Sequence, residues 1–296
     1  MRLVNERMRR EIYPWFLVRH CYDREAWEIA RPDDAQLVFN RRTTLAGNYA
    51  HLAFAALDLD FPAAMTQRLL AAALNARLEA ARSLPSWTES MATLDSLAEA
   101  GICRDPRAAN FWADFWAQGR EGKSDGSPKL CFMPQYWSLA NAMIAHADGR
   151  PQTISAAVDR LGAMKPLKKL GKKGEPWFEA MRALAIDALA GPGANFTDLL
   201  AAAGAAGERF WDTADGVMLE AVFSRWCLGF AGVARDRGWP PPDVDPHPNI
   251  PLALLRLPPL DVNQVGLPYP DENLKDAIQK QLEQLDPERA RPTNST

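Results

Sequence analysis

Cysteine and histidine are scarce in this chain. Its 296 residues include four of each, and no two cysteines are close enough to form a C-x-x-C pair. The sequence also has no H-E-x-x-H or Glu-x-x-His motif, the spacings with which a helix presents metal ligands on one face. We therefore expect no disulfide framework, no metal and no cofactor. Few and scattered thiols are typical of a reducing compartment.

Long apolar runs are also missing. No window of about 18 uncharged apolar residues occurs, which is the length that a membrane-spanning helix requires. The first residues, MRLVNERMRREIYPWF, carry charges where a signal peptide has its apolar region. The sequence therefore predicts a cytoplasmic protein without a membrane span.

Neither sign of charge dominates. The chain has 34 Lys and Arg against 37 Asp and Glu, a formal net charge of −3, so no global attraction draws it to nucleic acid or anionic membranes. The basic stretch KPLKKLGKKGEP, residues 165–176, lacks the aromatic neighbours and broad basic surface of a nucleic-acid site. We expect a solvated loop there, with contact to an acidic partner as the alternative, and no direct binding of nucleic acid.

No catalytic motif is recognisable. The G-K-S triplet at Gly122–Ser124 lacks the upstream glycine and the preceding strand of a phosphate-binding loop. Asp58 and Asp60 lack the D-D-x-x-D spacing of prenyl diphosphate chemistry, and Asp60 is expected to cap the helix that follows Pro62. A Cys–His nucleophile pair would require a tertiary contact that the sequence does not define. We therefore expect no catalytic residues and a protein that is not an enzyme.

Helical periodicity is what the sequence has in abundance. With 47% hydrophobic and 24% charged residues, the chain is expected to form a single all-helical domain over residues 1–296. Residues 136–151 and 152–164 are similar to residues 177–193 and 195–207. Each pair begins with an aromatic residue, carries small residues through its first helix and turns beside a glycine and a proline. This weak internal repeat predicts antiparallel helical hairpins, stacked as in α-helical repeat proteins.

One stretch, Gly207 to Trp239, has apolar residues on more than one helical face. We therefore expect a long central helix, continuous from Glu208 to Arg237 and enclosed by its neighbours. Glu220 and Arg225 are the charged residues in the apolar part of this helix. They are expected to form a buried ion pair.

After the central helix, residues 240–270 hold many of the 23 prolines. Proline fixes φ and lacks an N–H donor, so this segment is neither a long helix nor an interior strand. Its many leucines and valines predict an ordered segment that wraps helix faces, with one short helix at residues 251–257. Residues 271–285 have the spacing of an amphipathic helix, and residues 287–296 are expected to be frayed.

The aromatic residues support two interpretations. Ten tryptophans are more than a core of this size normally uses, and tryptophan is enriched at protein interfaces. In the predicted helix at residues 107–119, Trp112 and Trp116 form an i, i+4 pair beside Phe111 and Phe115. Core packing is the favoured interpretation of this stripe, and a partner surface is the alternative.

Acidic residues lie near the start of the predicted central helix. Asp212 and Asp215 would complement its positive end, and acidic side chains steer binding to a basic partner. Together with the aromatic stripe they give the candidate partner-contacting residues, which are Trp112, Trp116, Asp212 and Asp215.

Three segments carry a resemblance to a known family. YWSLANAMIAHADGRP, WFEAMRALAIDALAG and IPLALLRLPPLDVNQVGLPYP, within an all-helical chain, resemble the Imm49-type immunity proteins of bacterial polymorphic toxin systems. The resemblance covers the middle and C-terminal parts. It implies a cytoplasmic protein that binds and neutralises a cognate toxin and has no catalytic residues of its own. Occlusion of the toxin's active site is the expected mechanism.

Two other classes stay open. A helical-repeat scaffold would bind a peptide in a concave groove, and an all-helical enzyme would have a pocket with converging polar groups, for instance around Glu220, Arg225 and a histidine.

Overall fold

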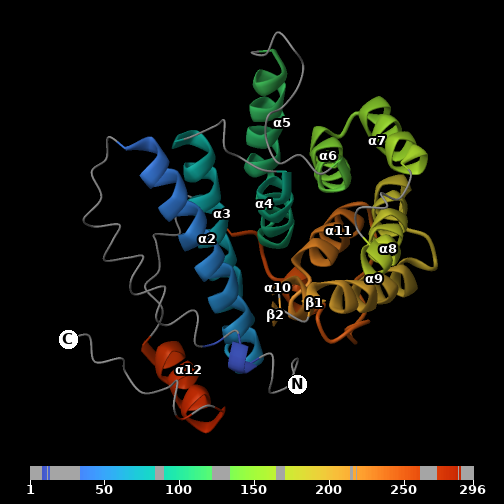
Figure 1. Ribbon diagram of the computed structural model, residues 1–296. Coiled ribbons are helices and arrows are strands. Elements are labelled where there is room, and N and C mark those ends of the chain that lie inside the picture. Colours follow the sequence, from blue (N-terminus) through green and yellow to red (C-terminus); the bar gives the residue numbers. More distant parts are fainter. Residues whose placement is uncertain are drawn as a thin grey trace.

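The structure is a computed structural model that describes residues 9–11, 13, 34–83, 90–121, 134–164, 171–213, 216–217, 219–260, 272–285 and 287. In these ranges the protein is all-helical, with helices packed against one another, apart from two strands of two residues each (Figure 1). The elements are α2 (Ala35–Asp58), α3 (Ala63–Ser83), α4 (Ser90–Cys103), α5 (Pro106–Glu121), α6 (Pro134–Asp148), α7 (Pro151–Ala163), α8 (Gly171–Ala190), α9 (Phe196–Trp211), β1 (Asp212–Thr213), β2 (Gly216–Val217), α10 (Leu219–Val222), α11 (Arg225–Asp236), the 3-10 helix η3 (Leu252–Arg256) and α12 (Glu272–Leu285).

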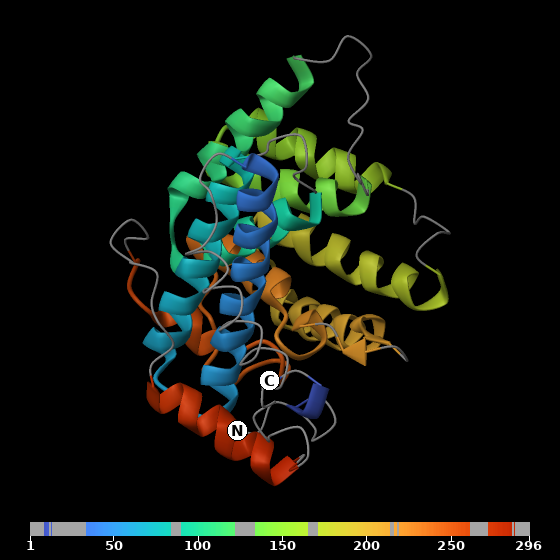
Figure 2. The same cartoon turned by 60° about the vertical axis from the view of Figure 1, so that its left-hand side comes forward.

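The helices form three neighbouring groups. The long helices α2 and α3 pack together on one side, α4 and α11 pack against each other in the middle, and α8 and α9 lie on the other side (Figures 1 and 2). Helix α3 contacts α4, and α11 contacts α8, so the middle pair joins the two sides. Helix α6 packs on α7, and α12 buries Leu274, Ile278 and Leu282 on one face, as its sequence predicted.

The predicted continuous helix from Glu208 to Arg237 is wrong. Helix α9 ends at Trp211, β1 and β2 pair antiparallel, and two shorter helices, α10 and α11, follow. The sequence Asp215–Gly216 is a hairpin turn signal that competes with helix formation. Asp212 therefore does not open a helix: it is the C-cap of α9, and its N–H donates to the Glu208 carbonyl.

Helix α11 keeps the enclosed position that was expected of the central helix. Every residue from Arg225 to Ala234 is buried, and the helix contacts α4, α6, α8, α9 and η3. Two glycines allow its close approach to α4. A Cβ atom at Gly229 would lie 2.8 Å from the Ala98 Cα, and one at Gly232 would lie 3.0 Å from the Gly101 carbonyl oxygen. The crossing of α4 and α11 therefore depends on the absence of side chains.

Gly229→Ala is expected to lower the free energy of unfolding by about 1–3 kcal/mol, because α4 must shift to admit the methyl group. The matched control is Gly47→Ala in α2, where a Cβ would meet no atom within 4 Å. There the gain in helix propensity is expected to stabilise the protein by roughly 0.5–1 kcal/mol. Chemical denaturation of both variants checks the opposite signs, and equal effects would contradict the close crossing.

The proline-rich segment is described up to residue 260. It buries Ile250, Leu252, Leu254 and Leu255, and η3 contacts α3, α4 and α11. The Asn249 side chain donates to the carbonyls of Gly204 and Ala221, at 3.1 and 3.3 Å. The short helix expected at residues 251–257 is η3. Residues 261–271 and the expected frayed tail from residue 288 onward lie outside the described ranges.

Two helix ends differ from the sequence-based expectation. Helix α3 begins at Ala63, so Asp60 is not at the N-cap position directly before the helix; it lies two residues after the end of α2, with φ of 59°. Asp105 does cap α5, because its carboxylate accepts the Arg107 N–H at 3.0 Å. Helix α8 begins at Gly171, so Lys172 and Lys173 belong to a helix and not to the expected loop.

Candidate functional site

The structure separates the candidate partner-contacting residues. Trp112 is fully buried in α5, where its ring packs edge-on against Phe111 and Phe115. Asp212 is half-buried in β1, at a different part of the molecule from α5 (Figure 1). Trp116 lies in α5 with its side chain outside the description, and Asp215 also lies outside it. Trp112 therefore has a packing role in this structure.

Tryptophan is a core residue in the described part of this protein. Six tryptophans there are buried, namely Trp112, Trp137, Trp177, Trp211, Trp226 and Trp239. Trp177 is the centre of an aromatic cluster with Tyr136, Phe210, Trp211 and Trp226, with ring centroids 4.9 to 5.9 Å from its own. The inference of a binding surface from the number of tryptophans is therefore wrong for these six residues.

The interior also holds a network of charged side chains, which we call the ionic core: Arg77 from α3, Asp95 and Glu99 from α4, Glu220 from α10 and Arg225 from α11. The Arg225 guanidinium donates to all three carboxylates, at 2.8 Å to Glu220, 2.6 Å to Glu99 and 3.1 Å to Asp95. Arg77 binds Glu99 and Asp95 from the other side, at 3.1 and 3.2 Å. The ionic core therefore ties α3 and α4 to α10 and α11.

The Glu220–Arg225 ion pair expected from the sequence is present, but it is part of this larger set. The Trp226 ring N–H also donates to Asp95, at 2.7 Å, and the side chains of Glu220 and Arg225 are each 6% exposed. The partners of Arg225 on α4 are 126 and 130 residues away in sequence, so no local pattern indicates them. The buried charges of the ionic core pair with one another, so these side chains have a structural role.

Three carboxylates share two guanidinium groups in the ionic core. Burial raises the pKa of Glu220 to about 7, although Arg225 acts in the opposite direction. Burial also raises the pKa of Glu99 above its usual range. The charge of the surrounding carboxylates raises the pKa of Arg225 in spite of its burial. Around neutral pH, a proton on Glu220 would balance the charges of the ionic core.

This raised pKa predicts that stability falls with rising pH. Between the ordinary glutamate pKa of 4.5 and about 7, the folded protein holds a proton that the unfolded chain has released. The contribution of Glu220 is therefore fully present below pH 4.5 and is lost as the pH rises through 7. Between these two pKa values, the free energy of unfolding is expected to fall by up to about 1.4 kcal/mol per pH unit.

Glu220→Gln mimics the protonated carboxyl and is expected to flatten this dependence. Urea unfolding from pH 5 to pH 8 measures it, with Glu283→Gln on the exposed face of α12 as the matched control. A slope for Glu220→Gln equal to that of the unchanged protein would contradict the protonated state.

Other candidate groups are also engaged in packing. Burial raises the pKa of the Cys103 thiol, and it raises that of Cys227 to about 12, so both are poor nucleophiles. Asp58 is held by Arg9 and Tyr13. Burial lowers the pKa of His51 to about 3, so its ring is neutral. Within the described ranges, no three His, Cys, Asp or Glu side chains are grouped so as to hold a metal ion.

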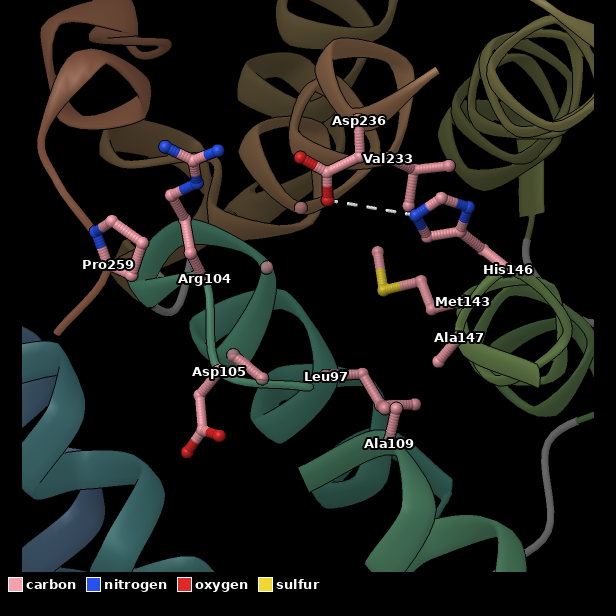
Figure 3. A pocket seen from close by; sticks show the side chains of 13 residues that line it. Leu97, Arg104, Asp105, Ala109, Met143, His146, Ala147, Val233, Asp236 and Pro259 are labelled. Carbon is pink, nitrogen blue, oxygen red and sulfur yellow. Dashed lines mark ion pairs between the residues drawn. The ribbon is translucent and has the colours of Figure 1, made fainter. Parts of the chain in front are cut away.

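A cavity of about 350 Å³ lies away from the ionic core, between α4, α5, α6 and α11 (Figure 3). Its apolar wall includes Leu97, Met143 and Val233. His146 from α6 faces Asp236 from α11, with 3.7 Å between the His146 Nε2 and a carboxylate oxygen. Arg104, which directly follows α4, also lines the cavity, and Figure 3 shows it near Pro259.

Sequence reasoning missed this cavity. Its polar residues come from three segments, and none has a motif around it. Arg104 draws notice only in the structure, where its backbone has a φ of 59°.

Comparisons of the chain with protein-family models, with curated proteins and with solved structures gave no match. None of the helices in the described ranges has an apolar stretch long enough to cross a membrane.

Proposed function

We propose that this chain is a cytoplasmic immunity protein that binds a cognate toxin and neutralises it by covering the toxin's active site. The resemblance of residues in α6, in α8 and in the proline-rich segment to Imm49-type proteins supports this function. A binding role also agrees with the chemistry of the interior, where thiols are buried and the ionic core pairs its charges internally.

The observation that carries the proposal is an acidic surface where α8 begins and α9 ends. Glu175 and Glu208 are exposed there, and Asp212 is half-buried directly after α9. Trp177 stacks on Phe210 with 4.9 Å between the ring centroids, which places these two helix ends side by side. We call Glu175, Glu208 and Asp212 the acidic end. Arg209 is an exposed basic neighbour, the His247 Nε2 lies 3.5 Å from a Glu208 carboxylate oxygen, and the side chains of Lys172 and Lys173 lie outside the description.

The surface chemistry favours a polar, charge-guided interface. Among the described residues, Val244 is the large hydrophobic residue that is strongly exposed, at 79%. An interface made with this surface would gain its specificity and association rate from charge complementarity. The partner that fits the acidic end is a toxin with a basic active-site face, such as a nuclease.

The test is co-expression with the product of the immediately upstream gene, which the proposal expects to be the toxin. We expect the unchanged chain to restore growth of cells that make the toxin. The double variant Glu175→Lys/Glu208→Lys should reduce the number of surviving cells at least about tenfold, because close like charges oppose docking. Asp276→Lys/Glu283→Lys on α12 changes the net charge equally at a distant exposed site and is expected to protect fully. Failure of the unchanged chain to protect, or equal loss in both double variants, would contradict the proposal.

A further inference from the structure

We propose that the cavity between α4, α5, α6 and α11 binds a small monocarboxylate with an apolar body, and that Arg104 holds the carboxylate. This inference is independent of the toxin-binding function. It depends on the backbone at Arg104, on the charges at the mouth of the cavity and on its apolar wall.

Arg104 occupies a backbone position that favours glycine. It follows the last residue of α4 with φ of 59°, and the next N–H, that of Asp105, donates to the Ala100 carbonyl at 2.9 Å. Helices that end with this hydrogen bond usually have glycine at the left-handed position. Asp60, with the same φ, is of a type that tolerates this conformation, whereas arginine is not. A strained residue at a cavity indicates that its side chain has a use there.

The charge of Arg104 is not neutralised by the described residues around it. No described acidic side chain forms an ion pair with it, and the Asp105 carboxylate binds Arg107, at 2.9 Å, and points away from the cavity (Figure 3). Asp236 is already bound by Arg235, at 2.9 Å, and faces His146. Burial lowers the pKa of Arg235, Asp236 acts in the opposite direction, and the charge of Arg104 also lowers it, as expected for two neighbouring guanidinium groups.

These charges select a ligand with one negative charge. The mouth of the cavity has the guanidinium of Arg104 in excess, since the charges of Arg235 and Arg107 are matched by Asp236 and Asp105. A carboxylate matches a guanidinium in shape and can accept two parallel hydrogen bonds from it. A doubly charged phosphate would be left with one charge close to Asp236.

The wall of the cavity selects an apolar body of limited size. Leu97, Met143 and Val233 contribute side chains, and the backbones of Gly101 and Gly229, which pack closely where α4 crosses α11, also line the cavity. The volume of about 350 Å³ is at the lower end of the range for small-molecule sites. A short fatty acid or an arylacetic acid has this combination of one carboxylate and a compact apolar body.

The experiment is isothermal titration of the full chain with octanoate and phenylacetate, and with their neutral amides. We expect saturable binding of at least one of the two acids, and binding of its amide that is at least about tenfold weaker, because a hydrogen bond between charged groups is lost. No saturable binding of either acid, or equal affinity for acid and amide, would overturn the proposal.

Arg104→Gly separates binding from folding. Glycine suits the left-handed backbone, so the melting temperature is expected to stay the same or rise while the affinity for the acid falls at least about tenfold. Arg160→Gln on the exposed face of α7 is the control and should bind as the unchanged chain does. Ala147→Phe, at an exposed position that lines the cavity, should fill it and abolish binding without disturbing the core. Unchanged affinity in both Arg104→Gly and Ala147→Phe would overturn the site.

Discussion

Replacing Arg225 by methionine is expected to lower the free energy of unfolding by about 3–5 kcal/mol, because removal of one member of a buried ionic network leaves the others uncompensated. Arg225 donates to Asp95, Glu99 and Glu220, and these side chains are 10% exposed or less. Without the shared cation, Asp95 and Glu99 would keep Arg77 as their cationic partner, and Glu220 would lose the one cation that binds it in the ionic core. Guanidinium chloride unfolding followed by circular dichroism measures the loss.

Two companion variants make this result specific. Arg237→Met removes an exposed arginine just after the same helix and is expected to change stability by no more than about 0.5 kcal/mol. Adding Glu220→Gln to Arg225→Met removes the carboxylate that has lost its cationic partner and should recover part of the loss. An unfolding midpoint of Arg225→Met equal to that of the unchanged protein would contradict the role of the ionic core.

Trp177→Ala is expected to destabilise the protein by about 3–5 kcal/mol, the range for truncation of a buried aromatic residue. Trp177 is 1% exposed and lies against Tyr136, Phe210, Trp211 and Trp226. The expected loss of stability has two contributions, the lost burial of a large ring and the lost contacts with neighbouring rings. Thermal and urea unfolding measure it.

Trp177→Phe keeps an aromatic ring in the cluster and should be less destabilising than alanine. Val244→Ala, at an exposed apolar position, should have almost no effect on stability. If Trp177→Ala instead left stability unchanged, tryptophan would not be a core residue at this position.

Local features of this fold could be predicted from the sequence. The enclosed position of α11 followed from apolar residues on several faces. An aspartate before a proline is a local signal for a helix start, and Asp105 caps α5 in this way. The break between α9 and α11 was missed because apolar periodicity was given more weight than the Asp215–Gly216 turn signal. Apolar spacing continues across a turn when the segments on both sides pack into the same core.

The sites depend on contacts that no local pattern reveals. Glycine is common just after the end of a helix, but Gly101 lies inside α4, which runs to Cys103. Gly101 instead takes part in the close approach of α4 to α11. The left-handed position therefore falls on Arg104. In the same way, Glu220 and Arg225 were recognisable as a pair, but Arg77, Asp95 and Glu99 join them only through packing of helices distant in sequence.

Calorimetric titration of the purified chain with an inactive form of the toxin encoded by the upstream gene tests the proposed function most directly. We predict a one-to-one complex whose affinity falls as the salt concentration rises, since the attraction between exposed charges is screened. Glu175→Lys/Glu208→Lys should weaken the complex, and Asp276→Lys/Glu283→Lys should leave it unchanged. Absence of a complex, or a complex that is indifferent to salt and to the charges of the acidic end, would contradict the proposed function.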